Sequence, residues 1–118
     1  MQIVKRESKP GVIILELSGP LQMGVECKRL ELAVDELLRD NHTRVILDLS
    51  RVTKLDSGGL GKIVSCFSRL KNAGGSLCLT GTTGMIDGLL KLTHADRFLK
   101  CYPTARAAEE SLSGPAKS

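Results

Sequence analysis

Two short stretches of the chain are densely hydrophobic and rich in β-branched residues, which predicts buried strands. They are residues 12–17 (VIILEL) and 44–49 (RVILDL). Residues 2–8 alternate more weakly, and a Pro10-Gly11 turn joins them to the first dense run. The chain is therefore predicted to open with an antiparallel hairpin, which Gly19-Pro20 ends.

Two longer stretches repeat a hydrophobic residue every three or four positions, which predicts helices that bury one side. They cover residues 26–40 and 57–71. A short loop is expected at residues 51–55, before the second helix. Residues 72–75 (NAGG) then supply glycine for a left-handed helix end.

The remaining elements are shorter. We expect a strand at residues 76–80, a helix at residues 85–92 and a last strand at residues 98–102. Pro103 suits the first turn of a final helix, which is followed by a small polar tail at residues 113–118. This alternation of strands and helices is typical of an α/β sheet covered by helices.

Composition narrows the class of protein. A chain of 118 residues that is 42% hydrophobic and 25% charged suits one globular domain. It has no hydrophobic run long enough to span a membrane and no hydrophobic signal core after Met1, so we expect a cytoplasmic protein. Only two Phe and one Tyr are present, which weakens any role in stacking nucleic-acid bases. The cysteines form no CxxC pair, so we expect no metal site and buried free thiols at Cys27, Cys66, Cys78 and Cys101.

The most informative segment is residues 55–62 (LDSGGLGK), between the second dense run and the second long helix. Asp56 or Ser57 is suited to cap the helix, because the side-chain oxygen can accept a free backbone N–H. Glycines at this point also suit a tight turn. Judged from local chemistry alone, this structural role is enough to explain the residues of the segment.

Enzymatic roles for this segment fail on specific residues. A phosphate-binding Walker loop needs a hydroxyl after its lysine, but Ile63 follows Lys62. A serine nucleophile elbow needs glycine where Leu55 stands. A catalytic triad needs a histidine base, and the sequence around His42 and around His94 is not that of a protease active site. We therefore expect no enzyme and no cofactor.

The same segment resembles a known signature. Residues 45–50 (VILDLS), Val52 and residues 55–61 together resemble the STAS domains of sulphate transporters and anti-sigma factor antagonists. Weaker similarity extends over residues 2–112. The resemblance implies one STAS domain over residues 1–112, with a mixed, mostly parallel sheet of about five strands and about four helices packed on it. The chain departs from the family pattern at Gln22, where Asp is frequent, and at Gly58, where many antagonists have a second hydroxyl.

The resemblance also implies a regulatory role. Such antagonists bind an anti-sigma factor that is also a serine kinase, and so release the sigma factor. The kinase then phosphorylates the motif serine, here Ser57, and a PP2C-type phosphatase reverses this. We expect a monomer or weak dimer with no direct nucleic-acid contact. Asp56 is expected to cap the helix and border the docking surface. The full set of expected partner contacts is Met23, Gly24, Leu55, Asp56, Gly58, Gly59, Leu60 and Lys62.

Two other functions stay open. The chain could be a STAS binding module in a transporter complex or a stress-sensing assembly, without this phosphorylation switch. It could also bind a small molecule or nucleotide at residues 81–84 (GTTG), although this motif is generic.

The net charge of +4 is concentrated in one segment. Residues 51–71 carry five basic side chains against Asp56 alone, and the rest of the chain is neutral. We therefore expect a positive surface around Ser57 that favours an acidic partner and binds it more weakly at high salt.

Overall fold

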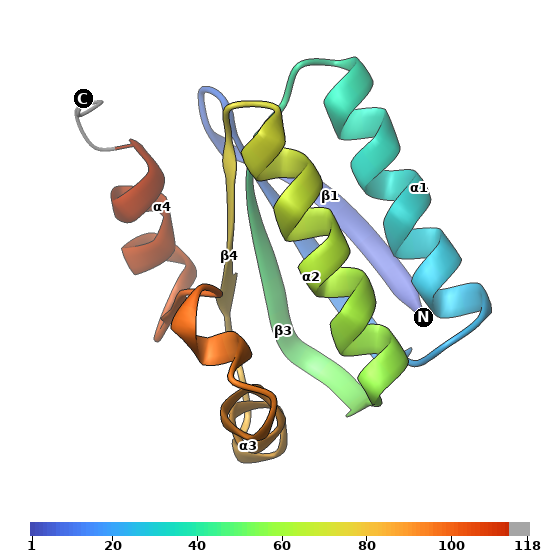
Figure 1. Cartoon of the computed structure of the whole chain (residues 1–118). Coiled ribbons are helices and arrows are strands. Elements are labelled where there is room, and N and C mark those ends of the chain that lie inside the picture. The colour runs from blue at the N-terminus through green and yellow to red at the C-terminus, as the bar shows by residue number, and fades with distance from the viewer. Residues whose placement is uncertain (114–118) are drawn as a thin grey trace.

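The computed structural model describes residues 1–113 and arranges five strands side by side in one sheet (Figure 1). The first two strands form the expected antiparallel hairpin, and each later strand pairs in parallel with the one before it. The sheet is therefore mixed and mostly parallel, as predicted. In order across the sheet, the strands are β1 (Gln2–Lys9), β2 (Val12–Leu21), β3 (Arg44–Leu55), β4 (Ser76–Thr80) and β5 (Cys101–Tyr102).

Helices cover both faces of this sheet. Figure 1 shows the two long helices side by side over one face, whereas the last helix lies beyond β4. In the described part of the chain the helices are α1 (Val25–Arg39), α2 (Ser57–Asn72), α3 (Gly84–Leu92) and α4 (Ala105–Ser113), with a 3-10 turn, η1 (Ala95–Arg97).

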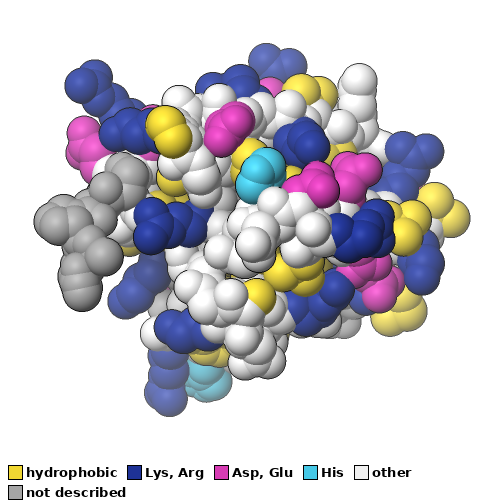
Figure 2. All heavy atoms as spheres, turned by 90° about the horizontal axis from the view of Figure 1, so that it is seen from above, with side chains coloured by type: hydrophobic (Ala, Val, Ile, Leu, Met, Phe, Trp, Pro, Cys, Tyr) yellow, Lys and Arg dark blue, Asp and Glu magenta, His cyan; other side chains and the backbone are white. Residues whose placement is uncertain are grey.

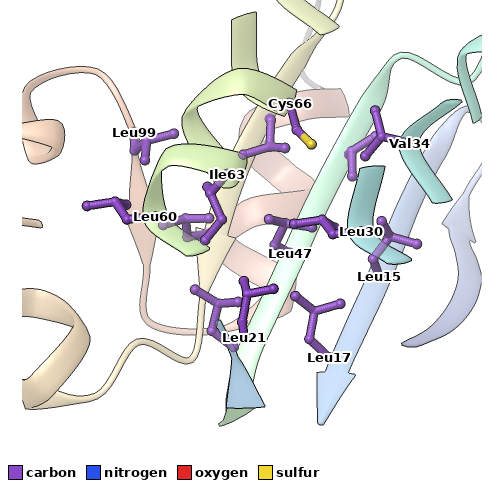
Figure 3. Close-up of a cluster of buried hydrophobic side chains, with 14 of the residues drawn as sticks. Leu15, Leu17, Leu21, Leu30, Val34, Leu47, Leu60, Ile63, Cys66 and Leu99 are labelled. Atoms are coloured by element: carbon purple, nitrogen blue, oxygen red, sulfur yellow. The ribbon is translucent and has the colours of Figure 1, made fainter. Parts of the chain in front are cut away.

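The hydrophobic core has two parts because β2, β3 and β4 are covered on both faces. Leu15 and Leu47 point toward Leu30 of α1 and Ile63 of α2 in the larger part (Figure 3). The alternate strand residues point the other way and pack under α4 in the smaller part, which comprises Val12, Ile14, Ile46, Cys78 and Ala108. Burial on both faces explains why the strands are dense hydrophobic runs rather than alternating ones.

Two strands are longer than predicted. β2 continues past Gly19-Pro20, and β3 continues through residues 51–55, which were expected to form a loop. The two strands stay paired to their ends, where Leu21 lies opposite Leu55. The polar residues in 51–55 conceal this extension, because in this part of β3 only Val52 and Leu55 pack against the core and the other three side chains are exposed.

The end of the chain also differs from the prediction. The strand expected at residues 98–102 is reduced to β5, because residues 98–100 form a turn and a bend that follow η1. The final helix begins after Pro103, and Thr104 caps it by accepting the backbone N–H of Ala107 at 3.1 Å. Ser113 belongs to α4 rather than to the tail, and residues 114–118 lie outside the described residues.

The cysteines are not all buried. Cys27, Cys66 and Cys78 are buried free thiols as predicted, but Cys101 is exposed. Cys101 lies in β5, which is two residues long and forms the edge of the sheet, so little of the protein covers it. Burial raises the pKa of Cys66 to about 11 and that of Cys78 to about 12.

This difference predicts selective thiol labelling. At neutral pH, a chromogenic disulfide reagent should modify Cys101 rapidly in the folded protein, and the other thiols only after unfolding. Folding raises the pKa of all four thiols, Cys101 included, so exposure rather than thiolate content separates them: the reagent can reach Cys101 but not the buried sulfurs. Cys101→Ser should abolish the rapid phase, and a rapid phase that persists in this variant would contradict the assignment.

Candidate functional site

Ser57 lies where β3 joins α2. Asp56 continues the extended backbone of β3, and Ser57 is the first residue of the helix. The Ser57 side chain is exposed, and within the described chain its hydroxyl has no hydrogen-bond partner. The strands β2, β3 and β4 are parallel, and their carboxyl ends all lie at the end of the sheet where α2 begins (Figure 1). A partner can therefore reach the hydroxyl without any rearrangement of the fold.

Asp56 is the helix cap, which leaves Ser57 free. Its Oδ1 accepts the backbone N–H of Gly59 at 2.7 Å, and its Oδ2 accepts that of Met23 at 3.2 Å. These two N–H groups, Gly59 first, lower the pKa of the Asp56 carboxyl. One carboxylate thus ties the start of α2 to the loop between β2 and α1.

Replacement of Asp56 should change how stability depends on pH. Because its pKa is lowered by folding, the ionised carboxylate stabilises the folded state above its ordinary pKa of 3.8, and this effect is lost as the pH falls through the folded-state pKa. Asp56→Asn should therefore lower the thermal midpoint at neutral pH, and the gap to the wild type should narrow in acid. Thermal melts between about pH 2 and pH 7 measure this gap. A gap that is the same at every pH would contradict the assignment.

Two glycines allow α2 to approach β2 and its loop. A Cβ on Gly59 would lie 2.2 Å from the carbonyl oxygen of Leu21, and one on Gly58 would lie 2.8 Å from Cβ of Met23. Both distances are shorter than side chains tolerate. Their close contacts are thus inside the molecule, and the contact of these two glycines with a partner stays a prediction. Gly61 differs, because a Cβ there meets nothing within 4 Å.

The expected partner contacts lie at different depths. Met23, at 73% exposure, and Gly24 are on the surface beside α2, and the φ of +110° at Gly24 suits glycine. Leu55 is half-buried against the core. Leu60 is only 4% exposed, so it lies beneath the surface that surrounds Ser57.

The expected positive surface around Ser57 is smaller than predicted. Nζ of Lys62 lies 3.5 Å from a carboxylate oxygen of Glu31, and Arg69 pairs with Asp35. Both basic residues therefore face acids on α1. Sequence counting missed this neutralisation, because it depends on how α1 and α2 pack.

A groove beside Ser57 was not foreseen. On one side it is formed by α2, and on the other by the segment that follows α3, whose Phe98 is 40% exposed. The ring of Phe98 packs against that of Phe67, with 5.4 Å between the centroids. The signal available in the sequence was an aromatic residue in a chain with few of them. The groove is lined by Ser57, Leu60, Gly61, Val64, Thr93, Ala95 and Phe98.

The opposite end of the molecule carries side chains of mixed type. Figure 2 looks down on the end where α1 and α2 terminate, and there hydrophobic, basic and acidic side chains are interspersed. Within residues 1–113, no group of three or more His, Cys, Asp or Glu side chains is placed to hold a metal ion. None of the described helices is long and apolar enough to cross a membrane.

Comparisons with known proteins agree with this fold. The family profile described as STAS domain matches residues 4–108. A protein of Thermotoga neapolitana with the provisional name anti-sigma factor antagonist is 32% identical over 80 residues, which are 68% of this chain and 71% of that protein. The crystal structure of a Thermotoga maritima protein with the same provisional name gives a TM-score of 0.86 at 27% identity, covering 93% of each chain.

The anti-sigma factor antagonist SpoIIAA shares the fold at lower identity. Its unphosphorylated form gives a TM-score of 0.76 at 14% identity, covering 97% of this chain and all of SpoIIAA. Its phosphorylated form gives a TM-score of 0.73 at 13% identity, covering 93% of this chain and 99% of SpoIIAA. At these identities the likeness concerns the fold alone. The profile match and the Thermotoga relatives show that the chain belongs to the STAS domain family, among the anti-sigma factor antagonists.

Proposed function

We propose that this chain captures an anti-sigma factor that is also a serine kinase, and thereby releases a sigma factor in the cytoplasm. Phosphorylation of Ser57 by that kinase ends the capture, and a PP2C-type phosphatase restores it. The chain acts by binding and catalyses no step itself. The observation that carries this proposal is the position of Ser57, exposed and unbonded at the first residue of α2, directly after the Asp56 cap.

The local backbone is suited to carry a phosphate. The first N–H groups of a helix have no partner within the helix, and the Asp56 carboxylate accepts chiefly that of Gly59. The remaining N–H groups and the helix dipole favour an anion at Ser57. SpoIIAA keeps this fold in both its unphosphorylated and its phosphorylated form. We therefore expect the fold to persist after modification.

Phosphorylation changes the docking surface even where it leaves the fold intact. Phosphate adds about −1.5 to −2 charges at neutral pH. It would stand next to the ionised carboxylate of Asp56 and close to the exposed Met23, which lies over Gly58. A partner that covers this surface must desolvate the dianion beside a like charge, which is unfavourable. Capture is therefore lost by a local change.

The direct test is phosphorylation in vitro. The purified chain is incubated with Mg-ATP and, in turn, with each anti-sigma factor kinase of its source organism, and the products are mapped by mass spectrometry. We expect a single phosphate on Ser57 with the cognate kinase. Ser57→Ala is the control and should bind the kinase but stay unmodified. If none of the kinases modifies Ser57, the proposed function is wrong.

A further inference from the structure

The groove beside Ser57 has a volume of about 360 Å³ and is lined largely by hydrophobic side chains. Ser57 and Gly61 lie one helical turn apart on its α2 side, and Phe98 lies on the other side. No charged residue is among its lining. The groove is therefore suited to an apolar side chain and poorly suited to the phosphates of a nucleotide.

Gly61 is unusual among the glycines of this site. It is the fifth residue of α2, it is exposed, and a Cβ there would meet no other atom within 4 Å. Gly58 and Gly59, in contrast, are required by contacts inside the molecule. A glycine within a helix is less stable than alanine, because it loses more conformational freedom on folding. Packing does not explain Gly61, but a requirement for an open groove does.

The position of the groove indicates what fills it. A kinase must bring the γ-phosphate of ATP to the Ser57 hydroxyl, and Ser57 is itself part of the groove wall. A specific protein interface covers about 800 Å² of each partner, so an interface centred on Ser57 extends over the groove. Lys54, three residues earlier, is exposed and makes no ion pair within the described chain, so it is free to face an acidic residue of that partner.

We propose that this groove seats an apolar side chain of the anti-sigma factor kinase, and that Gly61 is the residue that keeps the groove open. This inference rests on the proposed function and adds a contact that determines partner affinity. Buried apolar anchors near the centre of an interface carry much of its binding energy. The groove is thus a part of the docking surface distinct from the Ser57 hydroxyl.

The test compares two glycine-to-alanine variants. Gly61→Ala adds a methyl group to the groove, and Gly88→Ala adds one to an exposed helical position of α3 that also has open space around it. Both variants should raise the thermal midpoint, since both remove a helical glycine. Only Gly61→Ala should weaken binding of the kinase, measured by calorimetry in Mg-ADP, by about tenfold. The bulkier Gly61→Leu should weaken it further.

Each result separates the two proposals. If the kinase binds and phosphorylates the wild type, but binds Gly61→Ala as tightly as Gly88→Ala, the groove assignment is wrong and the proposed function stands. If Gly61→Ala raises the KM for phosphorylation with little change in kcat, the groove acts in docking as inferred. If no anti-sigma factor kinase binds or modifies the wild type, both proposals fail together.

Discussion

Ser57→Asp is expected to weaken capture of the anti-sigma factor kinase strongly and to leave the fold intact. The new carboxylate stands next to that of Asp56, and a docked partner would have to desolvate both. Like charges brought together in an interface cost several kcal/mol, so we expect affinity to fall about 100-fold, or by about 2.7 kcal/mol. Calorimetry with the cognate kinase in Mg-ADP measures the change.

The matched control for this variant is Ser57→Asn, which has nearly the same shape without the charge. If charge causes the loss, Ser57→Asn should bind much more tightly than Ser57→Asp. The thermal midpoint of Ser57→Asp should equal or exceed that of the wild type, because an acidic residue in the first turn of a helix is stabilising. Binding of Ser57→Asp with wild-type affinity would refute the switch.

The two layers of the fold follow from the sequence because periodicity reports burial directly. A helix such as α2 shows its buried stripe at residues 60, 63 and 70, and β2 shows burial on both faces as an unbroken hydrophobic run. The ends of elements are less visible. β3 continues to Leu55 through backbone pairing with β2, which polar side chains do not reveal.

The candidate site was predictable where it depends on one segment. Asp56 and Ser57 are neighbours in a motif, and the capping role of Asp56 follows from simple hydrogen-bond chemistry. The groove was not predictable, because Phe98 meets α2 only after the chain has passed through β4, α3 and η1. The ion pair of Lys62 with Glu31 likewise joins two helices that are far apart in sequence.

The glycines of the motif show the same limit. Sequence alone places Gly58, Gly59 and Gly61 in one class, suited to a tight turn or a close approach. The structure divides them by what surrounds each position, since Gly59 faces a backbone carbonyl and Gly61 faces open space. This division leads to opposite expectations for the same substitution two residues apart.

Gly59→Ala is expected to destabilise the protein severely. Its Cβ would lie 2.2 Å from the carbonyl oxygen of Leu21 and 2.9 Å from Cδ1 of Leu55. The Leu21 carbonyl cannot move freely, because Leu21 is fully buried and is held in β2 opposite Leu55 of β3. We expect the free energy of unfolding to fall by about 2–3 kcal/mol, as is usual when a packed site is overfilled. Chemical denaturation measures this loss.

Gly61→Ala is the internal reference for this experiment, because it makes the same chemical change in the same helix and should stabilise the protein. A loss below about 0.5 kcal/mol for Gly59→Ala, the range of ordinary surface substitutions, would show that α2 does not require this close approach. The expected strain also has a functional consequence. Relief requires α2 to move away from β2, which lengthens the hydrogen bond from the Met23 N–H to Asp56 and displaces Ser57 relative to Met23. Any Gly59→Ala protein that still folds should therefore be a poor kinase substrate, whereas the stabilised Gly88→Ala protein should be phosphorylated at the wild-type rate.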